Sequence, residues 1–290
     1  MKAHAKINLG LEVLGKRDDG YHEIVSILQT VSLADTLVFE PDDTLWLHCD
    51  VPGLQSQDNL VVRAAQVLQR ATGQHRGASI ELRKRIPVAA GLGSGAADAA
   101  VALVGLDRLW ETRLPPGSLA VLAAEVGSDV PFFLVGGTAL AEGRGELVSA
   151  LPPVPEVWMV VLDTRIVIES KTARLYSMLD PADFSSGART LKLAARLRRG
   201  GAIEESLLYN VFERVAFDCA PELQGYRSRF LEAGAARVHL AGAGPALFAL
   251  VSGEAEGRAV RANLESMGLD AYVVRTVDAK LWPSESDQQC

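Results

Sequence analysis

The stretch of this sequence with the clearest chemical potential is a glycine-rich segment, residues 87–100, that runs into a block of alanines. It places Gly91, Gly93 and Gly95 at alternate positions, and glycine allows positive φ angles and close approach of the backbone. The alanines favour a helix, whose first N–H groups lack partners and lie at the positive end of its dipole. Such a loop predicts an anion site, most often for phosphate. A tight turn into a buried alanine-rich helix would give the same pattern.

The glycine spacing fits neither of the two common phosphate fingerprints. The segment lacks the Gly-Lys-Ser/Thr ending of a Walker A loop, and Ala96 stands where the dinucleotide pattern G-x-G-x-x-G needs its third glycine. The nature of the phosphate ligand must therefore be argued from other residues.

Two charged residues could supply chemistry beside a phosphate. Lys6 lies in an alternating apolar–polar segment with Asn8, and Asp129 stands between Gly-Ser and an apolar run. A carboxylate near a lysine stays ionised and can act as a general base, and phosphoryl transfer depends mainly on positioning and charge stabilisation. From the residues alone, Lys6 and Asn8 also fit the wet face of a strand, and Asp129 also fits a helix cap.

Aromatic residues could bind a nucleobase. Tyr21 offers a flat face for stacking, and His22 offers hydrogen bonds to a base edge. Tyr176 could be a second stacking residue. Tyr21 equally fits an aromatic at a strand edge, and Tyr176 a tyrosine on a helix face.

Three motifs in order resemble the galactokinase–homoserine kinase–mevalonate kinase–phosphomevalonate kinase (GHMP) superfamily. They are Ala5-Lys-Ile-Asn-Leu9 with Gly20-Tyr-His-Glu23, the phosphate loop that begins at Pro87, and Gly127-Ser-Asp-Val-Pro-Phe-Phe133. The sequence resembles most the branch that phosphorylates the 2-hydroxyl of 4-diphosphocytidyl-2-C-methyl-D-erythritol in the non-mevalonate isoprenoid precursor pathway. Gly-Tyr-His separates this branch from its relatives. The resemblance implies ATP and Mg²⁺, with magnesium ligands that cannot be assigned and no metal site built from side chains.

The resemblance also implies residue roles. Asp129 would take the proton of the reacting hydroxyl, supported by Lys6. The substrate, a cytidine diphosphate-linked methylerythritol, would lie along Asn8, Tyr21, His22, Thr172, Tyr176, Gly242 and Gly244. ATP would lie against Asn59 and the loop residues Pro87, Val88, Ala89, Ala90, Gly91, Leu92, Gly93, Ser94, Gly95, Ala96 and Ala97. On spacing alone, Gly242 and Gly244 equally fit an ordinary hairpin turn.

The loop departs from the usual Gly-Leu-Gly-Gly-Gly-Ser-Ser-Asp of that branch. Residues 91–98 read Gly-Leu-Gly-Ser-Gly-Ala-Ala-Asp, so Ala96 and Ala97 replace both serines, and Ser94 matches the first serine of the wider superfamily. Gly95 stands where relatives offer a magnesium-binding serine. The loop therefore offers fewer hydroxyl groups, whereas its backbone N–H groups are unchanged.

Composition narrows the class of protein. The chain has 290 residues and a formal charge of −7, with a sequence pI of about 5.3, which argues against broad binding of nucleic acid or anionic membranes. Its three cysteines, Cys49, Cys219 and Cys290, have no metal or redox spacing and indicate a reducing cytoplasm. We expect a small-molecule substrate and a monomer or weak homodimer. The basic run 83–85 fits either solvated charges at a strand end or phosphate steering.

The expected fold is α+β, in two domains divided by the proline-rich stretch 151–155. Residues 1–152 would form the N-terminal GHMP kinase domain, similar to ribosomal protein S5 domain 2, with the ATP and catalytic motifs. Residues 153–290 would form the C-terminal domain, an α/β sandwich with a small sheet, helices on one face and the substrate groove.

Periodicity and capping residues predict the elements. The expected strands are 3–14, 21–32, 36–40 and 45–49, the last two as a hairpin, then 77–85, 157–162 and 271–277. The expected helices are 59–72, one from the loop to Trp110, 118–126 capped by Ser118, 172–179, 189–199, 204–218, 221–234 and 253–267. A polar tail follows Trp282.

Three other functions are compatible with the same elements. One is a related kinase for homoserine or mevalonate, against which Tyr21-His22 argues. Another is a lyase of the same fold, mevalonate diphosphate decarboxylase. The third is a non-enzymatic RNA-binding module of S5-like topology, against which the acidic charge and the Lys6/Asp129 pair argue.

Overall fold

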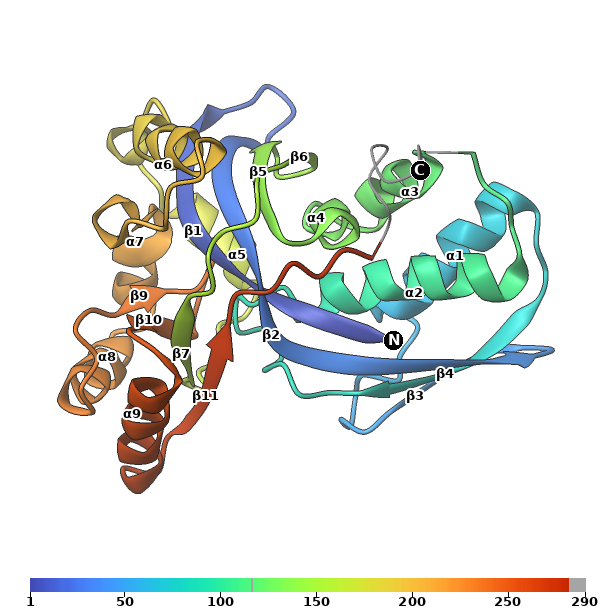
Figure 1. Ribbon diagram of the computed structural model, residues 1–290. Helices are drawn as coiled ribbons and strands as arrows, with labels where there is room; N and C mark the ends of the chain where they lie inside the picture. Colours follow the sequence, from blue (N-terminus) through green and yellow to red (C-terminus); the bar gives the residue numbers. More distant parts are fainter. Residues whose placement is uncertain (116, 282–290) are drawn as a thin grey trace.

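The computed structural model describes residues 1–115 and 117–281, so Pro116 and the predicted tail after Trp282 lie outside the described residues (Figure 1). The strands are β1 (Lys2–Lys16), β2 (His22–Asp42), β3 (Leu45–Cys49), β4 (Gly77–Arg83), β5 (Thr138–Gly143), β6 (Leu147–Ala150), β7 (Trp158–Asp163), β8 (Tyr209–Asn210), β9 (His239–Leu240), β10 (Leu247–Val251) and β11 (Asp270–Arg275). The α-helices are α1 (Leu60–Thr72), α2 (Ser94–Trp110), α3 (Ser118–Val126), α4 (Val130–Val135), α5 (Lys171–Ser177), α6 (Ala188–Arg198), α7 (Phe212–Cys219), α8 (Leu223–Glu232) and α9 (Glu254–Ser266).

The first half of the chain, with β8 from the second half at the edge, builds a sheet in the order β3-β4-β2-β1-β8, in which β5 pairs with β2 and β6 pairs with β5. Helices α1 to α4 gather on one side of it, as Figure 1 shows, and their apolar side chains share one core with the strands. The alanines of α2 let this helix lie deep in that core, where Ala99, Ala100 and Ala102 are fully buried. The predicted helix after the loop is therefore confirmed, ending at Trp110.

The second half builds an antiparallel sheet in the order β11-β7-β10-β9. Alternate residues of β7 point to opposite faces. Val160 and Leu162 pack with the core of α7, α8 and α9, whereas Met159 and Val161 pack with Ile7 and Leu9 of β1. The sheet thus carries helices on one face and the N-terminal half on the other, and the α+β class is confirmed. The domain division at 152/153 stays a prediction.

The predicted hairpin between residues 36–40 and 45–49 is wrong. Residues 22–32 and 36–40 instead belong to one long strand, β2, and β4 lies between β2 and β3. The short connection at Thr44 passes directly over the start of β4, where Ala78 N donates to Thr44 O at 3.0 Å. A Cβ at Gly77 would lie 2.3 Å from the Thr44 backbone, so glycine makes this crossing possible.

The predicted helix over residues 204–218 is also wrong. The chain forms a short 3₁₀ turn, Glu205–Leu207, and then β8, which pairs in parallel with Gly10 and Leu11 of β1 before α7 begins. Tertiary pairing at the sheet edge overrides the helical periodicity here. Among the helix starts, the Asn59 cap is confirmed, with Val61 N donating to Asn59 Oδ1 at 2.9 Å. The predicted Ser118 cap is wrong, because Gly117 occupies the N-cap.

Neither expectation for the basic run 83–85 describes Lys84, which is buried. Its ammonium donates to Asp35 Oδ2, Ser94 Oγ and Asp98 Oδ2, each at 2.5 Å. Asp35 also accepts from the backbone N–H groups of Arg85 and Ile86. This charged cluster ties β2 and the end of β4 to the first turn of α2.

No helix among residues 1–115 and 117–281 has the length and apolar character needed to span a bilayer.

Gly77→Ala is expected to destabilise the protein by about 1–3 kcal/mol, because the new methyl group has no room beneath Thr44. Gly225→Ala in α8 is the matched control, since nothing lies within 4 Å of its Cβ position. Urea unfolding measures both free energies, and equal stability of the two variants would contradict the crossing as the reason for glycine.

Lys84→Met is expected to destabilise the protein by about 3–5 kcal/mol, because it leaves two buried carboxylates without their cation. Arg83→Gln, next to it and exposed, should change the free energy of unfolding by less than about 1 kcal/mol. A small effect for Lys84→Met would show that the buried cluster contributes little to stability.

Candidate active site

A cavity of about 680 Å³ opens between β1, β2, α5, the phosphate loop and the turn that follows β9. It brings together ten residues predicted from the sequence: Lys6, Asn8, Tyr21, His22, Gly91, Gly93, Asp129, Thr172, Tyr176 and Gly242. These residues come from six separate stretches of the chain, and the fold brings them together in one cavity. The other predicted site residues do not line this cavity.

The phosphate loop is held from two sides by backbone contacts. Lys6 N donates to Leu92 O at 2.9 Å, and Ala246 N donates to Ala90 O at 3.1 Å. Gly91 has a φ of 88°, and a Cβ there would lie 2.1 Å from Ala241 O. The loop backbone therefore packs directly on the turn 241–244, as only glycine allows.

Most other loop residues turn their side chains away from the cavity. Ala90, Leu92 and Ala97 are buried, whereas Val88 and Gly95 are exposed. The Ser94 hydroxyl accepts from Lys84 and lies 3.3 Å from Asp35 Oδ2. Asn59 uses its side-chain oxygen to cap α1. Of the loop residues, only Gly91 and Gly93 line the cavity, so the loop contributes backbone rather than side chains to it.

Lys6 and Asp129 face each other across the cavity. Lys6 Nζ lies 4.0 Å from Asp129 Oδ2, and the side chains are 6% and 50% exposed. Burial lowers the pKa of Lys6, and the nearby Asp129 carboxylate acts in the opposite direction. Asp129 occupies the N-cap of α4, but its side chain makes no capping hydrogen bond to the helix.

A chain of hydrogen bonds orients Lys6. Its Nζ donates to Asn8 Oδ1 at 2.6 Å, Asn8 Nδ2 donates to Ser26 Oγ at 2.9 Å, and Ser26 Oγ donates to Gly10 O at 2.6 Å. Lys6 and Asn8 lie on the same face of β1. Both are buried, so this face of the strand is not exposed to solvent.

The aromatic residues form the far wall. The rings of His22 and Tyr176 stack with centroids 4.7 Å apart, and Tyr176 packs edge-on against Phe212. Tyr21 is 53% exposed, and the Arg144 guanidinium lies 4.7 Å from its ring centroid. Burial, followed by the charge of Lys16, lowers the pKa of His22, so its imidazole is neutral at pH 7.

Two residues that support this cavity were missed by the sequence reasoning. Lys171 lines it, and its Nζ donates to Ala89 O at 2.6 Å and to Gly244 O. Its place before Thr172, within a segment interpreted as a helix start, was the available signal. Asn210 donates to Leu240 O at 3.0 Å and to Gly242 O at 2.7 Å and so fixes the glycine turn. No sequence signal pointed to Asn210.

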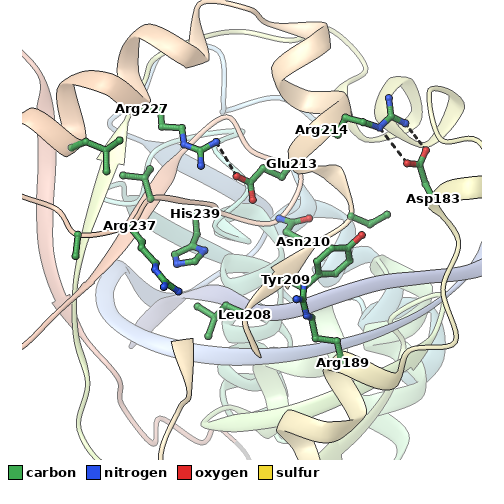
Figure 2. Close-up of a pocket in the computed structure, with 14 residues that line it drawn as sticks. Asp183, Arg189, Leu208, Tyr209, Asn210, Glu213, Arg214, Arg227, Arg237 and His239 are labelled. Atoms are coloured by element: carbon green, nitrogen blue, oxygen red, sulfur yellow. Dashed lines mark hydrogen bonds and ion pairs between the residues drawn. The ribbon is translucent and has the colours of Figure 1, made fainter. Parts of the chain in front are cut away.

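A second cavity, of about 750 Å³, lies beside β8, α7 and α8 and is lined by several arginines (Figure 2). None of the predicted site residues lines it. Two of the four arginines that line it are paired with carboxylates: Arg227 lies 3.3 Å from Glu213, and Arg214 bonds to Asp183. Of the residues that line or support the first cavity, Asn210 also lines the second. The first cavity holds the candidate site, because the predicted residues line it and not the second.

No group of three or more His, Cys, Asp or Glu side chains suited to a metal ion occurs within the described parts of the chain. Mg²⁺ commonly binds through one or two carboxylates together with the phosphates of a substrate.

Sequence comparison places both halves of the chain in one family. The model of the GHMP kinases N terminal domain matches residues 59–137, and that of the GHMP kinases C terminal domain matches residues 191–269. The chain is 45% identical to a 4-diphosphocytidyl-2-C-methyl-D-erythritol kinase of Dehalococcoides mccartyi, over 95% of this chain and 97% of that protein. It is 42% identical to the kinase of the same name from Symbiobacterium thermophilum, over 96% and 99%.

Structural comparison agrees. A crystal structure of 4-(cytidine 5'-diphospho)-2C-methyl-D-erythritol kinase matches with a TM-score of 0.81 and 36% identity, over 96% of this chain and 100% of that one. A homoserine kinase from Cytophaga hutchinsonii shares the fold, with a TM-score of 0.70 and 18% identity, over 95% and 94%. With its two matched domains and its full-length relatives, the chain belongs to the GHMP kinase family.

Proposed function

We propose that this protein transfers the γ-phosphoryl group of ATP to the 2-hydroxyl of 4-diphosphocytidyl-2-C-methyl-D-erythritol. The Lys6–Asp129 pair carries this proposal, because it faces the same cavity as the glycines of the phosphate loop. Relatives at 45% and 42% identity bear the name of this kinase over nearly their whole length. The family match favours a kinase over the RNA-binding module.

Asp129 accepts the proton of the reacting hydroxyl. Its carboxylate is half exposed in the free protein, so an alcohol can reach it, and Lys6 Nζ lies 4.0 Å away. The hydroxyl oxygen forms a bond to the γ-phosphorus while the bond to the β-phosphate oxygen breaks, and ADP leaves. Lys6 offsets the negative charge on the transferring group, which is the main demand of phosphoryl transfer.

The loop backbone from Gly91 to Ala97 binds the phosphates of ATP. Gly91 and Gly93, with φ values of 88° and 75°, line the cavity with their backbone. Such a cradle fits the close approach of phosphate oxygens to backbone N–H groups. Mg²⁺ carried by ATP would neutralise part of the phosphate charge.

The aromatic wall binds the cytosine of the acceptor. Tyr21, which is 53% exposed, offers a ring for stacking, and Tyr176 lies behind it in the wall, stacked on His22. The neutral imidazole of His22 offers one donor and one acceptor for a base edge. Thr172 and the turn at Gly242 lie between this wall and Lys6 and border the rest of the substrate. The cytoplasmic location and the monomeric or weakly dimeric state stay predictions.

With magnesium–ATP, we expect ADP release in the presence of 4-diphosphocytidyl-2-C-methyl-D-erythritol but not of methylerythritol phosphate, homoserine or mevalonate. The aromatic wall recognises a base that the other alcohols lack. A coupled ADP assay measures all four. Turnover with homoserine or mevalonate alone would keep the kinase chemistry and refute the acceptor. Carbon dioxide release from mevalonate diphosphate would indicate the lyase.

Asp129→Asn is expected to lower kcat by about 100-fold or more, because an amide cannot accept the proton. The same assay under saturating substrates measures it. Asp43→Asn, at an exposed position in the connection before β3, is the control and should leave kcat unchanged. Near-normal turnover by a folded Asp129→Asn variant would remove Asp129 from the mechanism.

Tyr21→Ala is expected to raise the KM for the cytidine-bearing acceptor by about tenfold while leaving the KM for ATP unchanged, because it removes one stacking face. Tyr21→Phe keeps the ring and should restore the KM. If the alanine variant changed the KM for ATP instead, the aromatic wall would belong to the nucleotide donor.

A further inference from the structure

Lys171 occupies the seam between the two glycine-rich segments of the site. Its Nζ donates to Ala89 O in the phosphate loop at 2.6 Å and to Gly244 O in the turn that follows β9. The side chain lines the cavity that Lys6 and Asp129 also line. An ammonium group has three N–H donors. With two donated to carbonyls, one remains for a ligand.

The charge of Lys171 has no counterpart in the described protein. Within residues 1–115 and 117–281, no carboxylate lies within 4.0 Å of its Nζ, whereas Lys6 faces Asp129 and Lys84 faces Asp35 and Asp98. Burial, followed by the charge of Lys6, lowers the pKa of Lys171 to about 8. A desolvated cation without an anion costs free energy, so the position favours a ligand that brings negative charge.

The phosphate loop needs such a cation from elsewhere. The segment from Gly91 to Ala97 has one hydroxyl, that of Ser94, and this hydroxyl is engaged with Lys84 and Asp35. Lys84 itself is held by two carboxylates, so it has no charge to offer. Of the four cations that line the cavity, Arg144 lies over the Tyr21 ring and Lys16 lies near His22. Lys6 and Lys171 are the two that lie beside the glycine-rich segments, where the phosphates would bind.

We infer that Lys171 is a phosphate-binding residue of this site, whose remaining N–H donates to a phosphate oxygen where the donor and the acceptor meet. The inference rests on the proposed function, in which both ligands carry phosphates. The oxygen belongs either to the γ-phosphate of ATP or to the diphosphate of the acceptor, and the two sources can be separated by binding.

The experiment compares matched ligand pairs on the full-length protein by calorimetry at pH 7. ATP against ADP isolates the γ-phosphate, and cytidine diphosphate against cytidine isolates the diphosphate. Lys171→Met should reduce the affinity ratio of one pair by about tenfold or more, as expected for a lost charge-assisted hydrogen bond. Lys171→Arg should retain most of that ratio. Lys192→Met, at an exposed position on α6, should not change it.

The affected pair identifies the source of the phosphate. If neither ratio changes in a Lys171→Met variant that melts like the wild type, the inference is wrong. Because these readouts need no turnover, they are independent of the substrate panel. Absence of turnover with every alcohol would refute the proposed function and leave the binding result standing.

A pH series tests the same inference without a destabilising substitution. The ammonium is charged below its pKa of about 8, so the wild-type ratio should fall between pH 7 and pH 9, whereas Lys171→Arg should hold its ratio. Besides Lys171, the titratable and charged groups facing the cavity are Lys6 and Lys16 on β1, Tyr21 before β2, His22 on β2, Asp129 before α4, Arg144 after β5 and Tyr176 on α5. Lys171→Arg keeps them all, so equal pH dependence in both proteins would overturn the inference.

Discussion

The site depends on a contact between two glycine-rich segments that is made by backbone atoms. At Gly91 a Cβ would lie 2.1 Å from Ala241 O and 2.8 Å from Gly244 O. At Gly242 a Cβ would lie 2.7 Å from Gly91 O. Because neither segment carries a side chain at the contact, strand β1 can place Lys6 against both. A methyl group on either glycine would separate the loop from the turn and, with it, the two halves of the cavity.

Two lysines with buried side chains, Lys84 and Lys6, differ in their partners, and the difference explains what each can do. Lys84 has two carboxylates at 2.5 Å; burial alone would lower its pKa, but Asp98 and Asp35 raise it overall. It is therefore a fixed structural charge. Lys6 has one carboxylate at 4.0 Å, too far for a direct bond, and its pKa is lowered. This looser pairing leaves room for a hydroxyl near both groups.

Local signals in the sequence predicted the parts of the fold that local physics determines. The Asn59 cap, the Gly73 end of α1 and the alanine block of α2 each specify an element through neighbouring residues. The order of strands was not accessible in this way. The crossing at Gly77 and the edge pairing of β8 with β1 depend on residues more than 30 and almost 200 positions apart. Periodicity therefore predicted a hairpin and a helix that tertiary contacts replace.

The candidate site likewise contains residues that local sequence identifies and residues that only distant contacts identify. Gly91, Asp129 and His22 stand in motifs, so the sequence alone identified them. Lys84 and Lys171 stand in no recognisable motif. What distinguishes them is the contact of Lys84 with two carboxylates and of Lys171 with two backbone carbonyls. Charge in a sequence carries no information about its counterion, which a fold supplies from distant elements. Sequence reasoning therefore found the residues that stand in motifs and missed those whose role depends on their surroundings in the fold.

Helix α5 connects base recognition to phosphate chemistry. It is short, yet it carries Lys171 at its first residue and Tyr176 five residues later. At about 1.5 Å per residue, these positions are separated by roughly 7.5 Å along the helix axis. Tyr176 stacks on His22, and Lys171 contacts both glycine-rich segments. In the function proposed above, a ligand that stacks at one end and carries phosphate toward the other would contact both ends of this one short helix, which would then position its reacting hydroxyl.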